Sequence, residues 1–373
     1  MPLIVDAHED LAWNALSFGR DYTRSARLTR QLESATDTPA RVGQAMLGLD
    51  DYLQAQVAVI FSALFASPRR RRDSEWETQV YTDVREAHNR YASQLDYYRR
   101  LCEAQKPFTL IGSRSDLKAV LATWQSAPGE PAAGSDDARR DESRRIGLVP
   151  LMEGADAIVE PQEAAWWMER GLRIVGLAWA GTQYAGGTAE PGPLTPLGRR
   201  LLSVMADIGL MLDLAHAADP AYLEALDRFE GTVIVSHANP RALMRNFAHP
   251  ERLLSDVMIA RLAEHDGVVG IMPHNDFLKA GWRRGDPRGE VTLDRVVDMI
   301  DHVCQVTGSA AHVGLGTDFD GGRGLDRMPA ELDTIADLPK LGGALRVRGY
   351  SEDAIAAILG RNWLRILERG LPA

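Results

Sequence analysis

Histidine and carboxylate side chains recur along this 373-residue sequence at places where short apolar runs end. Imidazole and carboxylate groups without a thiolate form a ligand set that suits Zn²⁺, and also Mn²⁺, Co²⁺ or Fe²⁺. Burying so many ionisable groups together is costly unless a metal ion or a partner compensates them, which favours a metal site over a structural role. The side chains concerned are His8, Asp10, Glu153, His216, His237, Asp318 and Asp320.

Each of these motifs is weak alone, because His-x-Asp and Glu-Gly occur often by chance. One carboxylate between two pairs of ligands favours two ions about 3.5–4 Å apart that share a bridging water. In this arrangement His8 and Asp10 hold one ion. His216 and His237 hold the other ion, and Glu153 bridges the two.

The elements that must position these residues alternate between short apolar runs and longer helical patterns. Such alternation predicts βαβ units and a parallel sheet, and eight runs favour a closed (β/α)₈ barrel, the TIM barrel, over an open doubly wound sheet. The carboxyl ends of the strands of such a barrel form one rim, so residues far apart in the sequence meet there. The expected strands are Leu3–Ala7, Val57–Leu64, Gly147–Met152, Arg173–Ala178, Leu210–Ala215, Thr232–Ser236, Gly267–Met272 and His312–Thr317.

Helix start signals precede several of the intervening segments. Thr195, Ser255 and Ser351 are expected to cap the helices that follow them, and Pro196 suits a first helical position. A stripe of apolar residues predicts one long helix from Glu75 to Gln105, with the stripe in the core and His88 packed on it. The stripe consists of Trp76, Val80, Val84, His88, Tyr91, Leu95 and Tyr98.

The whole chain, residues 1–373, is expected to form one barrel domain with loop insertions around 66–75, 126–145 and 184–194. The first insertion carries the basic run 69–72, which favours a solvated loop. The last insertion is rich in glycine and proline and follows a strand end, so it could line or cover a site at the rim.

Composition restricts the class of protein. The formal charge of −10 argues against nucleic acid as a partner, because binding of phosphates needs clustered Lys and Arg. Cys102 and Cys304 stand far apart and form neither a disulfide framework nor a zinc finger. We expect neither a signal peptide nor a membrane span, and the expected location is cytoplasmic.

Taken together in their order, the motifs resemble those of the membrane (renal) dipeptidase family, peptidase family M19, within the amidohydrolase-like superfamily. The likeness extends over nearly the whole chain, as in a divergent bacterial-type member. It rests on DAHEDL at 6–11, Glu153-Gly154, LTPLGRRLLSVMADIGLMLDLAHA at 194–217, Val235-Ser236-His237, HVGLGTDFDGG at 312–322 and NWLR at 362–365.

The resemblance implies a metallo-dipeptidase that cleaves the peptide bond of dipeptides with a hydroxide bridging two metal ions, most commonly Zn²⁺. It implies that the five residues assigned above to the two ions are zinc ligands, with Glu153 bridging, and that Asp318 handles the proton of the attacking water. Arg252 lines up with the arginine that holds the substrate carboxylate. Asp6, Asp213 and Asp320 are expected to support ligands or loops. Family members commonly form homodimers, and the resemblance implies one here.

Two positions depart from the family pattern. Trp179 stands where the family has a histidine that contacts the substrate and the developing oxyanion, and tryptophan can donate one N–H but carries no proton or charge. His274 stands where the family has a tyrosine, and one hypothesis is that it supplies the polar group that Trp179 does not provide. These changes leave two alternatives open: a related two-metal amidohydrolase acting on another small amide, such as an N-acyl amino acid, and a non-catalytic metal-binding paralogue.

Overall fold

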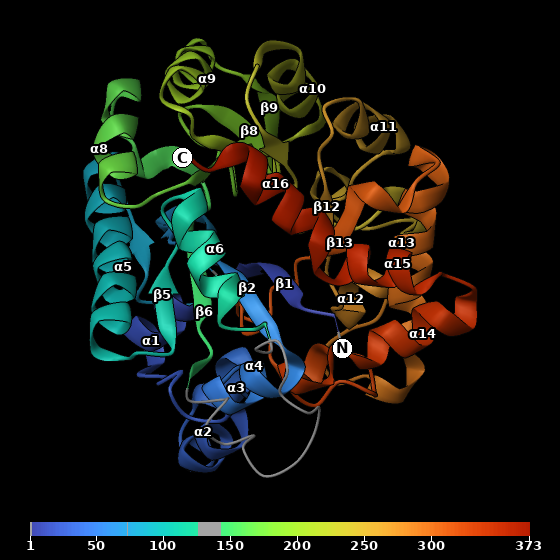
Figure 1. Ribbon diagram of the computed structural model, residues 1–373. Helices are drawn as coiled ribbons and strands as arrows, with labels where there is room; N and C mark the ends of the chain where they lie inside the picture. The colour runs from blue at the N-terminus through green and yellow to red at the C-terminus, as the bar shows by residue number, and fades with distance from the viewer. Residues whose placement is uncertain (1, 73, 126–142) are drawn as a thin grey trace.

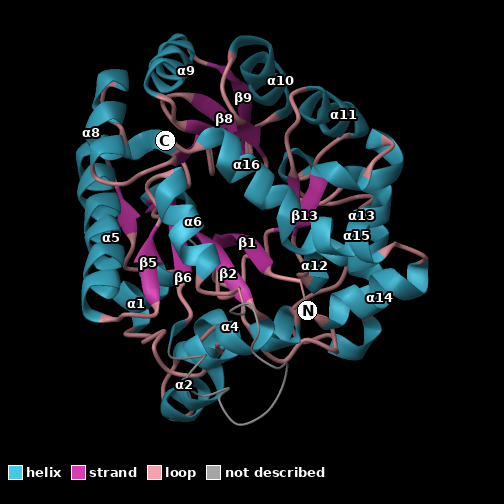
Figure 2. Ribbon diagram, viewed as in Figure 1, coloured by secondary structure: helices cyan, strands magenta, loops and turns pink. Residues whose placement is uncertain are grey.

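A computed structural model describes residues 2–72, 74–125 and 143–373. Its centre is a barrel of eight parallel strands surrounded by helices (Figures 1 and 2). The strands run in the order β11-β10-β7-β6-β2-β1-β13-β12, and a bridge between Val235 and Val269 joins the two end strands. The strands are β1 (Ile4–Glu9), β2 (Val57–Leu64), β6 (Ile146–Met152), β7 (Ile174–Gly176), β10 (Met211–Asp213), β11 (Val233–Ile234), β12 (Val269–Ile271) and β13 (Val313–Leu315).

This architecture confirms the predicted TIM barrel, and all eight expected strands overlap observed ones. The first and last strands of the barrel sequence, β1 and β13, pair side by side with Asp6 opposite Leu315. A ninth strand, β5 (Phe108–Leu110), pairs with the first half of β6 outside this circuit.

Helices form the outer layer of the molecule, around the barrel (Figure 1). The three predicted caps are confirmed, since the side chains of Thr195, Ser255 and Ser351 each accept a backbone N–H of the following turn. The α-helices are α1 (Leu11–Phe18), α2 (Ala26–Glu33), α3 (Thr38–Val42), α4 (Leu49–Ala55), α5 (Val84–Ala104), α6 (Arg114–Ala122), α8 (Ala164–Glu169), α9 (Pro196–Ile208), α10 (Asp219–Arg228), α11 (Asp256–Glu264), α12 (Asn275–Leu278), α13 (Leu293–Thr307), α14 (Lys340–Arg348), α15 (Glu352–Ala356) and α16 (Asn362–Gly370).

The core has two main parts. One cluster joins residues from opposite sides of the barrel, among them Val59, Val149 and Ile234, so these side chains fill its interior. Trp363 of α16 belongs to the same cluster, and its Nε1 donates to the Leu315 carbonyl at 2.9 Å. Helix α16 therefore crosses the end where the strands begin, which faces the viewer in Figure 1. The larger cluster packs the outer faces of the strands against the helices.

The predicted helix over 75–105 is wrong in its first part, because α5 begins only at Val84. Asp83 ends the preceding segment: its side chain accepts the backbone N–H groups of Arg85 and Glu86 and so caps the helix. Val80 lies instead in the short strand β4 (Val80–Tyr81), which pairs with β3 (Ser67–Pro68). Trp76 lies off the helix and lines the cavity described below. His88 packs against Trp166 and Trp167, as expected for a packed side chain.

The three predicted insertions have different outcomes. Segment 184–194 is a hairpin of β8 (Ala185–Gly187) and β9 (Glu190–Leu194), and segment 66–75 contains β3 and a 3₁₀ turn, Arg69–Arg71. Arg70 and Arg71 both bind the Glu190 carboxylate, so this basic run attaches one insertion to the other and is not simply solvated. Most of segment 126–145 lies outside the described residues.

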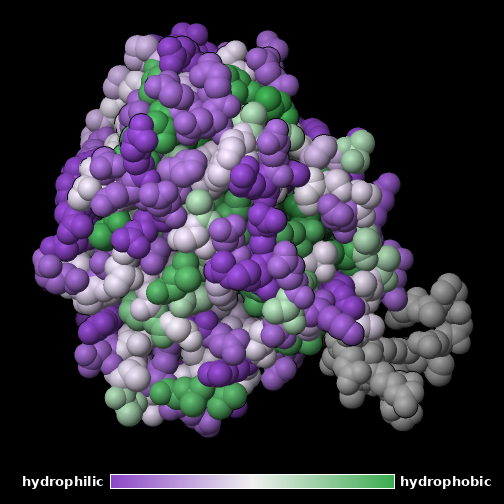
Figure 3. Space-filling model, turned by 90° about the vertical axis from the view of Figure 1, so that its left-hand side faces the viewer, coloured by the Kyte–Doolittle hydropathy of each residue, from purple (hydrophilic) through white to green (hydrophobic). Residues whose placement is uncertain are grey.

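The surface shown in Figure 3 is largely hydrophilic, with apolar residues in small separate patches. Among the described residues, no helix has the length and apolar character needed to cross a membrane.

Candidate active site

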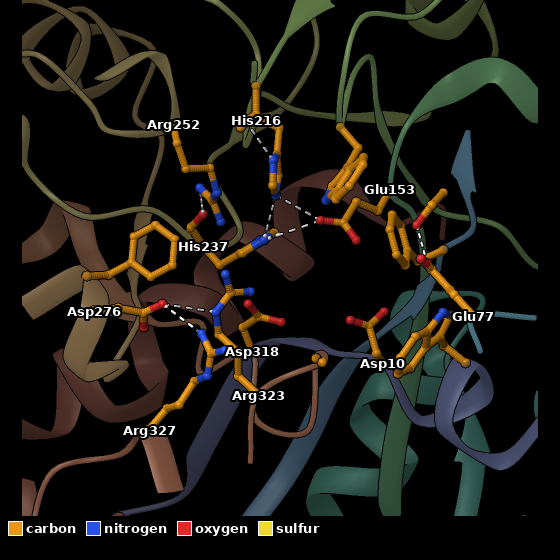
Figure 4. Close-up of a pocket in the computed structure, with 18 of the residues that line it drawn as sticks. Asp10, Glu77, Glu153, His216, His237, Arg252, Asp276, Asp318, Arg323 and Arg327 are labelled. Carbon is orange, nitrogen blue, oxygen red and sulfur yellow. Dashed lines mark hydrogen bonds and ion pairs between the residues drawn. The ribbon is translucent and has the colours of Figure 1, made fainter. Parts of the chain in front are cut away.

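The carboxyl ends of five barrel strands bring six predicted site residues to one place. His8 lies in β1 and Asp10 directly follows it, while Glu153 follows β6. The remaining three, His216, His237 and Asp318, lie in the loops after β10, β11 and β13. Figure 4 shows the labelled members of this set, Asp10, Glu153, His216, His237 and Asp318, around one cavity. All six are buried.

Glu153 lies at the centre of this cluster. Its Oε1 is 3.0 Å from Nε2 of His216 and 3.3 Å from Nε2 of His237. Its Oε2 is 3.5 Å from Nε2 of His8, which is 3.8 Å from Oδ2 of Asp10. The two carboxylate oxygens thus face two different groups of side chains, as a bridging ligand must.

Two groups of three residues each place their potential ligand atoms within 4.8 Å of one another. One consists of His8, Glu153 and His237, and the other of His8, Asp10 and Asp318. Asp318 therefore lies close to the pair His8 and Asp10, as expected for residues that meet at one rim.

Hydroxyl groups orient two of the histidines. Ser236 Oγ donates to Asp213 Oδ2 at 2.5 Å, so it can accept from Nδ1 of His237, which is 2.8 Å away. This contact leaves the lone pair of the His237 Nε2 directed toward Glu153 and His216. Thr188 Oγ1, from the tip of the β8–β9 hairpin, lies 3.0 Å from Nδ1 of His216.

Buried carboxylates hold the surrounding loops. Asp6 accepts the backbone N–H and the hydroxyl of Thr317, which fixes the strand end that precedes Asp318. Asp320 accepts the backbone N–H of Met46 at 3.0 Å and lies 3.3 Å from Arg20.

Several site residues adopt left-handed backbone conformations. The φ angles are +65° at His216, +54° at Asp318 and +62° at Asp320. Non-glycine residues rarely adopt such angles, and each costs on the order of 1–3 kcal/mol unless the surroundings enforce it. Gly154, with φ of +83°, provides the same conformation without a side chain next to Glu153.

Burial and neighbouring charges raise the pKa of some side chains in the cluster and lower that of others. Burial opposes the charged form of His8, but the surrounding carboxylates, Glu153 first and then Asp10 and Asp318, together outweigh it and raise the pKa of His8 to about 10. Burial lowers the pKa of His216 to about 4 and that of His237 well below its ordinary value. Burial also raises the pKa of Asp318 to about 7.

The donor set fits divalent metal ions. Both ring nitrogens of His8 and Oδ1 of Asp10 are buried without a hydrogen-bond partner among the described residues. Nε2 atoms of His216 and His237 face each other at 3.1 Å, although the Nδ1–H of His237 is already engaged by Ser236. Buried polar atoms without partners are costly unless a metal ion binds them, and imidazole with carboxylate is a suitable ligand set for such an ion.

The cavity beside this cluster has a volume of about 430 Å³, the size of a small-molecule site. One side of it is aromatic, with Trp13, Phe65, Trp76 and Trp179. Trp179 packs 5.0 Å from Phe65 and 6.2 Å from His216, measured between ring centroids. Trp179, where the resemblance implies a histidine, is therefore part of an aromatic wall of the cavity.

The other side of the cavity is cationic. Arg252 is buried there, and its Nη1 donates to the His237 carbonyl at 2.8 Å. Burial lowers the pKa of Arg252 to about 10, so the guanidinium group remains charged at neutral pH. Arg323 and Arg327 also line this side and share the Asp276 carboxylate.

His274 is fully buried and is not among the described residues that line the cavity. Burial lowers its pKa to about 3, so its imidazole is neutral at ordinary pH. Its neighbours Asp276 and Phe277 line the cavity instead. The hypothesis that His274 supplies the polar group absent at Trp179 stays a prediction, and no lining position of His274 supports it.

Sequence reasoning missed several residues of the cavity wall. Trp76 and Glu77 were assigned to a helix, although Asp83 marked its true start. Arg323 and Arg327 follow the strand end that carries Asp318 by a few residues, and that short separation was the signal available for them.

The sequence matches the model of membrane dipeptidase (peptidase family M19) over residues 1–370. The chain belongs to this family. The membership confirms the predicted resemblance and the prediction of a metal-dependent hydrolase of the dipeptidase class.

Individual relatives and one solved structure are similar to this chain. The chain is 29% identical to an uncharacterised protein of Klebsiella pneumoniae, over 63% of this chain and 86% of that protein. It is 36% identical to an uncharacterised dipeptidase of Schizosaccharomyces pombe, but that match spans 46% of this chain and 39% of the relative. A metallopeptidase of Rhodobacter sphaeroides, solved with a phosphinate mimic of L-Ala-D-Ala, has the same fold, with 21% identity, a TM-score of 0.75 and 99% of both chains covered.

Proposed function

We propose that this protein hydrolyses the peptide bond of dipeptides at a site that holds two divalent metal ions, with Zn²⁺ as the expected metal. The observation that carries the proposal is the position of Glu153, whose Oε2 faces His8 and whose Oε1 faces His216 and His237, inside a cavity of small-molecule size. His8 and Asp10 would hold one ion, His216 and His237 the other, and Glu153 both. When bound, the ions supply Lewis acidity to the scissile carbonyl and acidify a water molecule.

Asp318 is the residue that we assign to proton transfer. Its carboxylate lies with His8 and Asp10 at the centre of the site, and its backbone is held in a left-handed conformation. A carboxylate in this position can accept a proton from the attacking water and pass it to the leaving amine.

Arg252 is the residue that we assign to the terminal carboxylate of the substrate. Its bond to the His237 carbonyl and its burial hold the guanidinium group in one orientation beside the metal ligands. A planar guanidinium group binds a carboxylate through two parallel hydrogen bonds, so it fixes the distance from the carboxylate to the scissile bond.

A second candidate is an amidohydrolase that acts on another small amide, such as an N-acyl amino acid. It is favoured by Trp179, which gives an apolar wall where the family has a polar side chain. A homodimer, implied by the family resemblance, stays a prediction.

The test is hydrolysis of a mixed library by zinc-reconstituted protein, read by mass spectrometry, with metal content measured on the same sample. The library contains L-Xaa-L-Xaa and L-Xaa-D-Xaa dipeptides and N-acyl amino acids. Cleavage of free dipeptides supports the proposal, whereas cleavage of N-acyl amino acids alone supports the second candidate. Complete inactivity with two ions bound contradicts both and leaves the non-catalytic paralogue.

The matched variant for this test is Glu153→Gln, which keeps the shape of the bridging side chain and removes its charge. We expect it to bind fewer than two ions and to lose activity. A variant that retained both ions would contradict the bridging role of Glu153.

A further inference from the structure

The cationic side of the cavity holds more than the one arginine that a dipeptide carboxylate needs. Arg323 lies in the loop after β13, and Arg327 ends the 3₁₀ turn Leu325–Arg327 that follows it. Both guanidinium groups approach Oδ2 of Asp276, from α12, at 3.3 and 3.2 Å. Figure 4 shows Arg252 and Arg323 on the same side of the cavity, across from Asp10 and Glu77.

Phe277 connects this cluster with Arg252. The guanidinium carbon of Arg252 lies 5.6 Å from the centroid of the Phe277 ring, and that of Arg323 lies 5.4 Å from it. Two cationic groups therefore flank one aromatic side chain of the cavity wall. Arg252 and Arg323 therefore lie close to the same part of the cavity wall.

Three guanidinium groups gather on this side of the cavity, those of Arg252, Arg323 and Arg327. Arg323 and Arg327 share one carboxylate, that of Asp276, and Asp318 lies in range of Arg252 and Arg323. A cluster of cationic groups in a cavity wall attracts an anionic ligand and is stabilised by it.

Partial burial increases this effect. The side chain of Arg327 is 25% exposed and that of Arg323 is 34% exposed, and both line the cavity. Burial lowers the pKa of Arg327, which reflects the cost of keeping its charge away from water. Oδ1 of Asp276 has no hydrogen-bond partner among the described residues.

We propose that Arg323 and Arg327 form a second carboxylate-binding subsite, so that the preferred substrates are dipeptides whose C-terminal residue is aspartate or glutamate. Arg252 would take the terminal carboxylate, and the arginine pair would take the carboxylate of the side chain. This inference rests on the proposed dipeptidase function, because that function places the C-terminal residue beside Arg252.

The main experiment compares kcat/KM for L-Ala-L-Glu with that for L-Ala-L-Gln, and the D-Glu and D-Gln counterparts, in zinc-loaded enzyme. Glutamine has the same shape as glutamate but no charge, so the ratio isolates recognition of the carboxylate. A charge-assisted contact predicts a preference for glutamate on the order of tenfold or more. We expect this ratio to fall toward one in Arg327→Gln and in Arg323→Gln.

Arg261→Gln is the matched control, because Arg261 lies on α11 and pairs with Asp227 at a surface position away from the cavity. Its glutamate-to-glutamine ratio should equal that of the wild type. If the wild type cleaves both dipeptides with equal kcat/KM, the subsite is refuted and the dipeptidase function stands. A wild-type preference that survives both arginine substitutions refutes the assignment to these residues.

If the protein is not a dipeptidase, neither the glutamate nor the glutamine dipeptide is cleaved, which distinguishes this case from the loss of the subsite alone. In that case calorimetric titration of the metal-loaded protein with free glutamate and free glutamine tests the subsite directly. Tighter binding of glutamate, abolished in Arg327→Gln, supports it, and equal binding overturns it.

Discussion

At the scale of single residues, the orientation of the site histidines depends on side chains behind them. Asp213, Ser236 and His237 form a continuous chain of hydrogen bonds, in which the carboxylate fixes the hydroxyl and the hydroxyl fixes the imidazole. Thr188 contacts His216 in the same way from the hairpin tip. Partners of this kind set the orientation and basicity of a metal-binding imidazole.

Replacing Ser236 with alanine should therefore weaken metal binding with little change in fold. Asp213 would keep two backbone N–H contacts, but the Nδ1 of His237 would have no acceptor. We expect zinc affinity to fall by roughly 10–100-fold, measured by competition with a chromogenic chelator. Ser93→Ala, at an exposed hydroxyl on α5, is the control, and equal affinity in all three proteins would contradict the role of Ser236.

At the scale of elements, the hairpin β8–β9 is attached to the turn Arg69–Arg71 by ion pairs. Glu190 accepts Nε and Nη2 of Arg70 at 3.0 and 2.9 Å and Nε of Arg71 at 2.7 Å. Arg71 also binds the Ala189 carbonyl, next to Thr188. The two insertions thus support each other beside His216.

The attachment should contribute to stability in a pH-dependent way. Hydrogen bonds from Arg70, together with those from Arg71, lower the pKa of Glu190 from 4.5 to about 2. The contribution of Glu190 to the free energy of unfolding is therefore complete above about pH 4.5. It is lost as the pH falls toward 2, because the Glu190 carboxylate of the unfolded chain has the higher pKa and binds a proton first.

The variant Glu190→Gln tests this prediction in urea unfolding at pH 7, 4.5 and 3. We expect a loss of roughly 1 kcal/mol at pH 7, as partly exposed ion pairs usually contribute, and a smaller difference from the wild type at pH 3. Glu103→Gln, at an exposed glutamate of α5, controls for loss of one carboxyl group. A difference that stays constant across this range would contradict the ion-pair explanation.

The sequence indicated the barrel and its ligands because both depend on patterns with clear physical causes. Buried parallel strands are apolar on both faces, and their carboxyl ends share a rim, so His8, Glu153 and His237 could be brought together without a structure. The start of α5 was misplaced because the apolar spacing continues past Asp83 into a strand. Arg323 and Arg327 lie in irregular segments, where periodicity predicts nothing and only three-dimensional contacts reveal their shared partner.

At the scale of the whole molecule, both ends of the sequence are parts of the same structure. Thr317 donates to Asp6, Asn14 donates to the Asp320 carbonyl, and β1 pairs with β13. These contacts join residues more than 300 positions apart. The interpretation of residues 1–373 as one domain depends on them, because neither end can leave the barrel without opening it.

We therefore expect one cooperative unfolding transition. Differential scanning calorimetry should give a single heat-absorption peak, coincident with the loss of far-ultraviolet circular dichroism. Two resolved peaks, or a helical signal that persists after the first, would show that a part of the chain unfolds independently.

The left-handed backbone at Asp318 also affects how the family could diverge. Asparagine is one of the few residues that adopts this conformation readily, and its codons differ from those of aspartate by one base. A single base change can therefore remove the carboxylate that we propose for proton transfer and leave the barrel and the proposed metal ligands intact. In this fold, one base change is then enough to convert a hydrolase into a protein that binds metal without catalysis.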